Sequence, residues 1–166
     1  MTEHDVAAAG PEAVAATRVK ICGITQLEDA EFAAQAGAWA VGMVFHEPSP
    51  RRCSVGEAVA IGAALRRRVE LCGVFVNRPL EEIASVCDQV GLTLVQLHGD
   101  EGPSFCSEVA RRTGARVIKA MQIADGGDVH ALDRFHTDFH LADARGPRGD
   151  VRGGTGASFD WGLLDR

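Results

Sequence analysis

Residues 71–97 read LCGVFVNRPLEEIASVCDQVGLTLVQL, and this stretch decides the fold. It opens and closes with short apolar runs, 71–76 and 92–97. Neither run alternates strictly between apolar and polar residues, which is typical of strands buried on both faces of a parallel sheet. Between them, Pro79 can begin a helix, and apolar residues then recur at helical spacing until Gly91. The stretch therefore predicts a strand, a helix and a second, parallel strand.

The same alternation extends in both directions from this unit. Further buried strands are expected, in chain order, at 18–23, 39–45, 116–121 and 138–143. The spacing leaves room for one helix between consecutive strands. The sequence therefore predicts six βα units in one domain, a size that 166 residues can fill.

Helix boundaries are indicated by capping and proline signals. Thr25 and Ser54 are each followed three residues later by Glu, the capping-box pattern, and Pro103 can begin a fourth helix. The run Arg66–Arg68 suits the C-terminal end of the second helix, because cations are favourable there. The remaining expected segments are a short fifth helix at 128–135 and the first turns of a sixth at 159–166.

Six βα units suit either an open doubly wound sheet or part of an eight-unit barrel. Periodicity does not choose between them, but the positions of polar residues favour the barrel. Both folds place functional residues at the carboxyl ends of their strands, and an open sheet gathers them at one switch point. Here such residues lie at or just after the ends of nearly every strand, namely Cys22, Arg51, Arg52, Asn77, Gln96, His98 and Asp143, and Lys119 lies within the fifth strand.

The composition of the chain argues against several classes of function. Apolar residues make up 46% of the chain and charged residues 24%, which is ordinary for a soluble globular protein. The formal net charge is −6, so the chain carries no basic footprint for nucleic acid or anionic lipid. No apolar run is long enough to cross a bilayer. We therefore expect no nucleic-acid partner and no membrane association.

The cysteines indicate a reducing compartment. There are five, an odd number, and none forms a C-x-x-C pair. Cys72 and Cys87 fall in apolar segments, where a reduced core thiol is the usual case. Residues 1–17 contain early acidic residues and a proline instead of a secretory signal, so we expect a flexible N-terminal tail. Together these features predict a cytoplasmic protein.

Several motifs together identify a resemblance. VKICGIT at 19–25, WAVGMVF through SPRR at 39–52, GVFVN at 73–77, VQLHGDE at 95–101, VIKA at 117–120 and Asp143 through GGTG to FDW at 161 resemble phosphoribosylanthranilate isomerase. They occur in that family's order and cover essentially all of 18–166. The resemblance implies a (β/α)₈-barrel of the TIM type and an isomerase domain over 18–166.

The resemblance also implies a reaction. The family converts N-(5′-phosphoribosyl)anthranilate into 1-(2-carboxyphenylamino)-1-deoxyribulose 5-phosphate, an Amadori rearrangement in tryptophan biosynthesis, without a cofactor. An acid protonates the ribose ring oxygen, and a base removes the C2′ proton of the opened Schiff base. Each positioned proton transfer typically contributes about 10²–10⁴-fold to the rate. The expected partner is therefore this small phosphosugar-anthranilate substrate.

Particular residues match the family's functional positions. The resemblance makes Cys22 the general base and Asp143 the general acid. It places Arg51 on the anthranilate carboxylate, which a guanidinium fits geometrically, and Gln96 and His98 in the substrate pocket. Four of these residues have a plainer interpretation: Cys22 as a core thiol, Asp143 as a loop brace, Arg51 as a solvated surface residue and His98 as a structural histidine.

Two further patterns in the sequence bear on ligand binding. GGTG at 153–156 resembles the mobile loop that closes over substrate, with a ligand-free flexible loop as the alternative. It lacks the third glycine of a dinucleotide fingerprint. His130, His136 and His140 do not share one helical face, so we expect no metal site.

The sequence departs from the family at its C-terminal end. The chain ends at Asp165–Arg166, where family members continue with two more βα units and their phosphate loops. We therefore expect an incomplete, open barrel whose unpaired edges favour self-association. The alternatives are an inactive fragment or an interaction module that needs a complementary pair of βα units. An open flavodoxin-like binding protein would show strand order 2-1-3 instead of 1-2-3.

Overall fold

A computed structural model describes residues 17–144 and 158–165 of the chain. Their strands form one six-stranded sheet in the order β1-β2-β3-β4-β5-β6, and every neighbouring pair is parallel. The order confirms the barrel-type arrangement and excludes the flavodoxin-like one, in which the order would double back. The strands are β1 (Lys20–Cys22), β2 (Ala40–Val44), β3 (Glu70–Phe75), β4 (Leu94–Leu97), β5 (Arg116–Ile123) and β6 (Phe139–Ala144).

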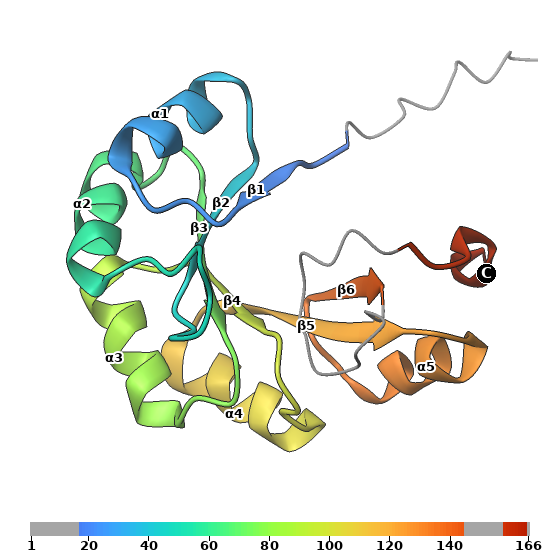
Figure 1. The fold of residues 1–166 in the computed structure, drawn as a ribbon. Coiled ribbons are helices and arrows are strands. Elements are labelled where there is room, and N and C mark those ends of the chain that lie inside the picture. Colours follow the sequence, from blue (N-terminus) through green and yellow to red (C-terminus); the bar gives the residue numbers. More distant parts are fainter. Residues whose placement is uncertain (1–16, 145–157, 166) are drawn as a thin grey trace, which may run out of the picture.

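The sheet curls, and the helices follow one another along its convex face (Figure 1). This is the arrangement that consecutive right-handed βαβ crossovers produce. None of the helices in the described ranges has the length and apolar character that a bilayer crossing requires. They are α1 (Leu27–Gln35), α2 (Val55–Leu65), α3 (Leu80–Val90), α4 (Pro103–Thr113) and α5 (Gly126–Ala131), with 3₁₀ turns η1 (Leu132–Arg134) and η2 (Trp161–Leu164).

Burial differs between the middle and the edges of the sheet. Every residue of β2 and β4 is buried, and so is all of β3 except Glu70, because helices cover one face and the curl covers the other. The edge strands β1 and β6 are largely half-buried or exposed. Continuous apolar runs therefore marked the central strands correctly. The inner face carries an apolar cluster that includes Cys72, Leu94 and Ile118.

Some expected helix boundaries were correct. Ser54 and Glu57 form the complete capping box at the start of α2, with the Glu57 backbone N–H donating to Ser54 Oγ over 3.2 Å and the Ser54 N–H donating to Glu57 Oε2 over 2.9 Å. Pro79 directly precedes α3, and Pro103 is the first residue of α4, as expected. The glycines that follow α3 and α4 adopt the left-handed conformation that ends helices.

Other boundaries were wrong for identifiable reasons. Thr25 does not cap α1, because the backbone N–H groups of Gly23 and Ile24 both donate to the Gly42 carbonyl over 2.9 Å and delay the helix to Leu27. The arginines at 66–68 follow α2 instead of forming its last turn.

Two C-terminal segments also differ from expectation. The fifth helix begins at Gly126, not at 128, because the Asp125 carboxylate accepts hydrogen bonds from the N–H groups of Gly127 and Asp128. It then tightens into η1. The sixth helix expected at 159–166 is, in the described residues, the single 3₁₀ turn η2.

Candidate active site

Cys22 lies at the carboxyl end of β1 on the inner face of the curled sheet. It pairs in register with Gly42 of β2, which in turn pairs with Cys72 of β3. A Cβ built on Gly42 would lie 3.0 Å from the Cys22 sulfur and 3.1 Å from the Lys20 ammonium nitrogen. The absence of a side chain at Gly42 therefore makes room for both groups. Regular alternation along β1 points Lys20 and Cys22 to the same face.

Arg51 reaches Cys22 from the loop after β2. Its Nη1 donates to the Cys22 carbonyl oxygen over 3.4 Å. The side chain crosses Gly23, whose φ of +92° and lack of a Cβ permit the approach, because a Cβ there would lie 2.7 Å from Arg51 Cδ. Gly23 is thus needed for both its backbone conformation and its size. The structure brings Arg51 beside Cys22, although the two are 29 residues apart.

Gln96, His98 and Asp143 form a chain of polar contacts on the same face. Gln96 Nε2 lies 2.9 Å from His98 Nδ1, and His98 Nε2 lies 3.3 Å from Asp143 Oδ2. When the Gln96 amide donates to Nδ1, the ring carries its proton on Nε2 and donates to Asp143. Gln96 is 2% exposed, and its Oε1 has no hydrogen-bond partner in the described part of the chain. Buried polar atoms are normally paired, so this oxygen is suited to a ligand donor.

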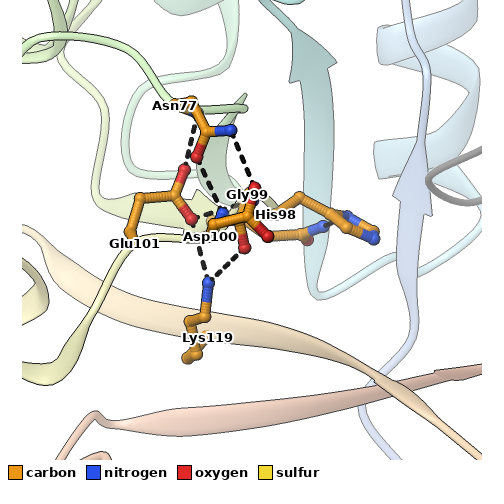
Figure 2. A network of polar contacts seen from close by, with 7 residues as sticks. Asn77, His98, Gly99, Asp100, Glu101 and Lys119 are labelled. Carbon is orange, nitrogen blue, oxygen red and sulfur yellow. Dashed lines mark hydrogen bonds and ion pairs between the residues drawn. The ribbon is translucent and has the colours of Figure 1, made fainter. Parts of the chain in front are cut away.

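Asn77, which was expected after the third strand, and Lys119, which was expected within the fifth, belong to a different network (Figure 2). Lys119 points to the helix side of β5, where its Nζ donates to the Gly99 carbonyl over 2.8 Å and to Glu101 Oε2 over 2.9 Å. Glu101 also accepts from the backbone N–H groups of Asn77 and Gly99, each over 2.8 Å. Asn77 Oδ1 accepts from the Asp100 N–H over 2.7 Å.

This network joins the loops that follow β3 and β4. Its members are the asparagine of the GVFVN motif and the GDE of the VQLHGDE motif, together with the lysine of VIKA. The loops that this network holds begin at the carboxyl ends of β3 and β4, which is the edge of the sheet where the site residues lie. These motif residues therefore brace the rim of the sheet, and the sequence alone did not separate them from residues that face the site.

The thiols differ sharply in their surroundings. Cys53, Cys72, Cys87 and Cys106 are buried, whereas Cys22 is half-exposed, and all five are free. Burial raises the pKa of Cys53 to about 11 and those of Cys72 and Cys87 to about 12. The expectation that Cys72 and Cys87 are core thiols is confirmed.

The structure gathers the predicted site residues into two groups, Arg51 with Cys22 and Gln96 with His98 and Asp143. The GGTG stretch at 153–156 and most of the predicted tail at 1–17 lie outside the described residues. Among the described residues, no group of three or more His, Cys, Asp or Glu is placed to hold a metal ion. Arg52, which the resemblance gives no role in the site, forms an exposed ion pair with Glu47 at 2.8 Å.

Comparison with known proteins gives a consistent result. The sequence model of N-(5′-phosphoribosyl)anthranilate (PRA) isomerase matches residues 19–166. The N-(5′-phosphoribosyl)anthranilate isomerase of Rubrobacter xylanophilus is 49% identical over 150 residues, which are 90% of this chain and 71% of that protein. That of Geobacter metallireducens is 45% identical over 146 residues, covering 88% of this chain and 69% of the relative.

Solved structures agree with the sequence comparison. The crystal structure of phosphoribosyl anthranilate isomerase from Thermotoga maritima superimposes with a TM-score of 0.80 at 42% identity, covering 90% of this chain and 70% of that one. A phosphoribosyl anthranilate isomerase in complex with reduced 1-(o-carboxyphenylamino)-1-deoxyribulose 5-phosphate gives a TM-score of 0.71 at 43% identity over 78% of this chain and 66% of that one. With its curled parallel sheet and its matched motifs, the chain belongs to the phosphoribosylanthranilate isomerase family.

Proposed function

We propose that Cys22 and Asp143 are the base and the acid of the Amadori rearrangement of N-(5′-phosphoribosyl)anthranilate. The protein is an isomerase of tryptophan biosynthesis by its family. In the proposed reaction, Asp143 gives a proton to the ribose ring oxygen. The bond from that oxygen to C1′ breaks as the anilino nitrogen forms a C=N bond. Cys22 then removes the C2′ proton, and the enol-amine tautomerises to 1-(2-carboxyphenylamino)-1-deoxyribulose 5-phosphate.

The observation that carries this proposal is the polar chain from Gln96 through His98 to Asp143. His98 occupies Oδ2 of the carboxyl group, which leaves Oδ1 as the oxygen that would hand a proton to the substrate. A fixed carboxyl orientation is what a general acid needs, because proton transfer requires hydrogen-bond reach to the receiving atom. Side-chain exposures of 14% for His98 and 22% for Asp143 keep the pair accessible to a ligand on the inner face.

Arg51 and Gln96 are proposed to bind the substrate. The Arg51 guanidinium lies beside Cys22 and is exposed, so it is free to take the anthranilate carboxylate in a two-point contact. The unpartnered Gln96 Oε1 suits a hydroxyl or N–H donor of the substrate. Binding at these two places would set the sugar between the thiol and the carboxyl group, which is the positioning that isomerisation needs.

The test is turnover of freshly made phosphoribosylanthranilate, followed by anthranilate fluorescence. Cys22→Ser and Asp143→Asn should each lower kcat by at least about 10²-fold. Asp88→Asn, an exposed helix position, serves as the matched control and should leave kcat unchanged. Retained turnover in either site variant, with an unchanged Tm, would show that the residue is not catalytic.

The fold also supports a proposal about assembly. We propose that the chain, acting as an isomerase domain over 18–166 in the cytoplasm, associates with a second copy through its β1 edge. Val19 and Ile21 of this edge are 49% and 40% exposed, and Phe32 of α1 beside them is 74% exposed. Unpaired strand edges next to apolar side chains promote association. Sedimentation should show a dimer that Phe32→Glu converts to a monomer, and a monomer at all concentrations would contradict the proposal.

A further inference from the structure

We propose that Lys20 is a positioning residue whose ammonium group compensates the negative charge that the Cys22 sulfur carries when it acts as the base. This inference rests on the proposed role of Cys22 as the base. A thiol accepts a proton only as thiolate, so a site that uses one needs a compensating cation nearby. The inner face of β1 and β2 offers a specific candidate for this cation.

Geometry places the ammonium group beside the sulfur. Lys20 pairs in register with Ala40, yet its Nζ lies over Gly42, the partner of Cys22. The lysine side chain therefore leans along the strand toward the thiol. Each of the two atoms lies about 3 Å from one point above Gly42, so they are at most about 6 Å apart. An opposite charge within about 4–6 Å favours the ionised form of a group.

The small residues of β2 make this approach possible. Ala40 and Gly42 are fully or nearly buried and present at most a methyl group to the inner face. A larger side chain at either position would fill the space through which Lys20 passes. The small residues of β2 therefore leave space between the Lys20 ammonium group and the Cys22 thiol.

Other charged groups that face Lys20 are already engaged. Glu70 of β3 shares the row of Lys20 and Ala40, and its carboxylate is held by Arg116 at 2.7 Å. Cys72 of β3 shares the row of Cys22, but burial raises the pKa of its thiol to about 12, against the opposing effect of Lys20. Cys72 therefore stays neutral. Arg51 contacts the backbone carbonyl of Cys22, not its sulfur.

Lys20 itself has no carboxylate partner in the ion pairs of residues 17–144 and 158–165. A cation on the inner face without a fixed anion is available to a thiolate. In this arrangement the charge of the Lys20 ammonium group acts on the Cys22 sulfur.

The experiment measures alkylation of Cys22 by iodoacetamide without substrate, between pH 6 and pH 10, with the modified site read by peptide mass spectrometry. Lys20→Met should slow alkylation at pH 7 about ten-fold and move the rate profile to higher pH. Lys20→Arg should restore most of the rate, because it keeps the charge. Arg18→Met, which removes a cation two residues before β1, is the matched control and should leave the profile unchanged.

Two outcomes would overturn the inference. One is a Lys20→Met profile that coincides with that of the unmodified chain. The other is an equal change in Arg18→Met, which would mean a general field instead of a local contact. Near-ultraviolet circular dichroism of each variant confirms that the fold is intact, so that lost packing is not read as a charge effect.

Turnover separates this inference from the proposed function. Lys20→Met should lower kcat with KM changed less than about three-fold, whereas a residue that binds substrate would raise KM and leave alkylation unchanged. If Cys22→Ser keeps full turnover while Lys20→Met still slows alkylation, the base assignment fails and the Lys20 contact stands. If alkylation is unaffected while Cys22→Ser is inactive, the Lys20 inference alone fails.

Discussion

Lys119 and Glu101 form an ion pair of 2.9 Å between side chains that are only 2% and 4% exposed. The pair lies on the helix side of the sheet, away from the proposed acid and base. Glu101 accepts two backbone hydrogen bonds besides, so the carboxylate ties β5 to the loops after β3 and β4. The pair therefore stabilises the rim on which the site is built.

Lys119→Met should lower the free energy of unfolding by about 3–5 kcal/mol, because it leaves a buried carboxylate without its cation. Urea denaturation measures the change. Arg111→Met is the control: its pair with Glu108 is exposed and 3.7 Å long, so its loss should cost less than about 1 kcal/mol. Equal effects of the two substitutions would mean that Glu101 is sufficiently held by the backbone alone.

Gly42→Ala should lower turnover of phosphoribosylanthranilate by about ten-fold or more, because the new methyl group would displace the Cys22 sulfur or the Lys20 ammonium. Steady-state kinetics measures the effect. Gly56→Ala offers a matched change, since a Cβ there meets only Ser54 Oγ at 4.0 Å. Wild-type kinetics in Gly42→Ala would show that neither group needs its present position.

Ellman's reagent at pH 8 should modify one thiol quickly in the folded protein and all five in denaturant. Burial raises the pKa of Cys53 to about 11 and those of Cys72 and Cys87 to about 12, and it also raises the pKa of Cys106. These four therefore remain protonated and shielded. Cys22→Ser should remove the fast phase. A fast phase of two or more thiols would contradict the described burial.

Acid should destabilise the protein partly through Glu70. A hydrogen bond from Thr93 and, secondarily, the Arg116 pair lower the pKa of this carboxyl group, while desolvation opposes them. A carboxyl group whose pKa is lower in the folded state contributes stability above its unfolded value, near 4.5, and loses it as the pH falls through the folded value. The Tm of Glu70→Gln should consequently fall less between pH 6 and pH 3 than that of the unmodified chain. Glu108→Gln, a solvent-exposed control, should keep the original pH dependence.

Capping and proline signals predicted a helix boundary correctly where that boundary depends only on neighbouring residues. The capping box at Ser54 and the prolines before α3 and within α4 were correct because each acts within one turn of its own helix. Thr25 failed because a long-range contact with the Gly42 carbonyl holds the chain before α1. A capping pattern does not reveal such a competitor.

The sequence did not separate candidate residues that face the site from those that face the helices. Cys22, Gln96, His98 and Asp143 share the inner face, whereas Lys119 turned out to face the helices. Alternation along β5 separates Lys119 from its neighbours only when the register of the strand is known. The motif resemblance selected the proposed acid and base, and it carried no information on which motif residues brace the loops.

By itself, the sequence determined the order of the six strands and of the first five helices, the parallel character of the sheet and the family. These follow from apolar periodicity, helix-end signals and motifs, all of which are properties of neighbouring residues. Only the tertiary structure decided which side chains meet: Lys20 with Cys22 over Gly42, His98 with Asp143, and Lys119 with Glu101. The reason is physical, because the curl of the sheet and the register between strands bring together residues that are far apart in the sequence, such as His98 and Asp143, which are 45 positions apart.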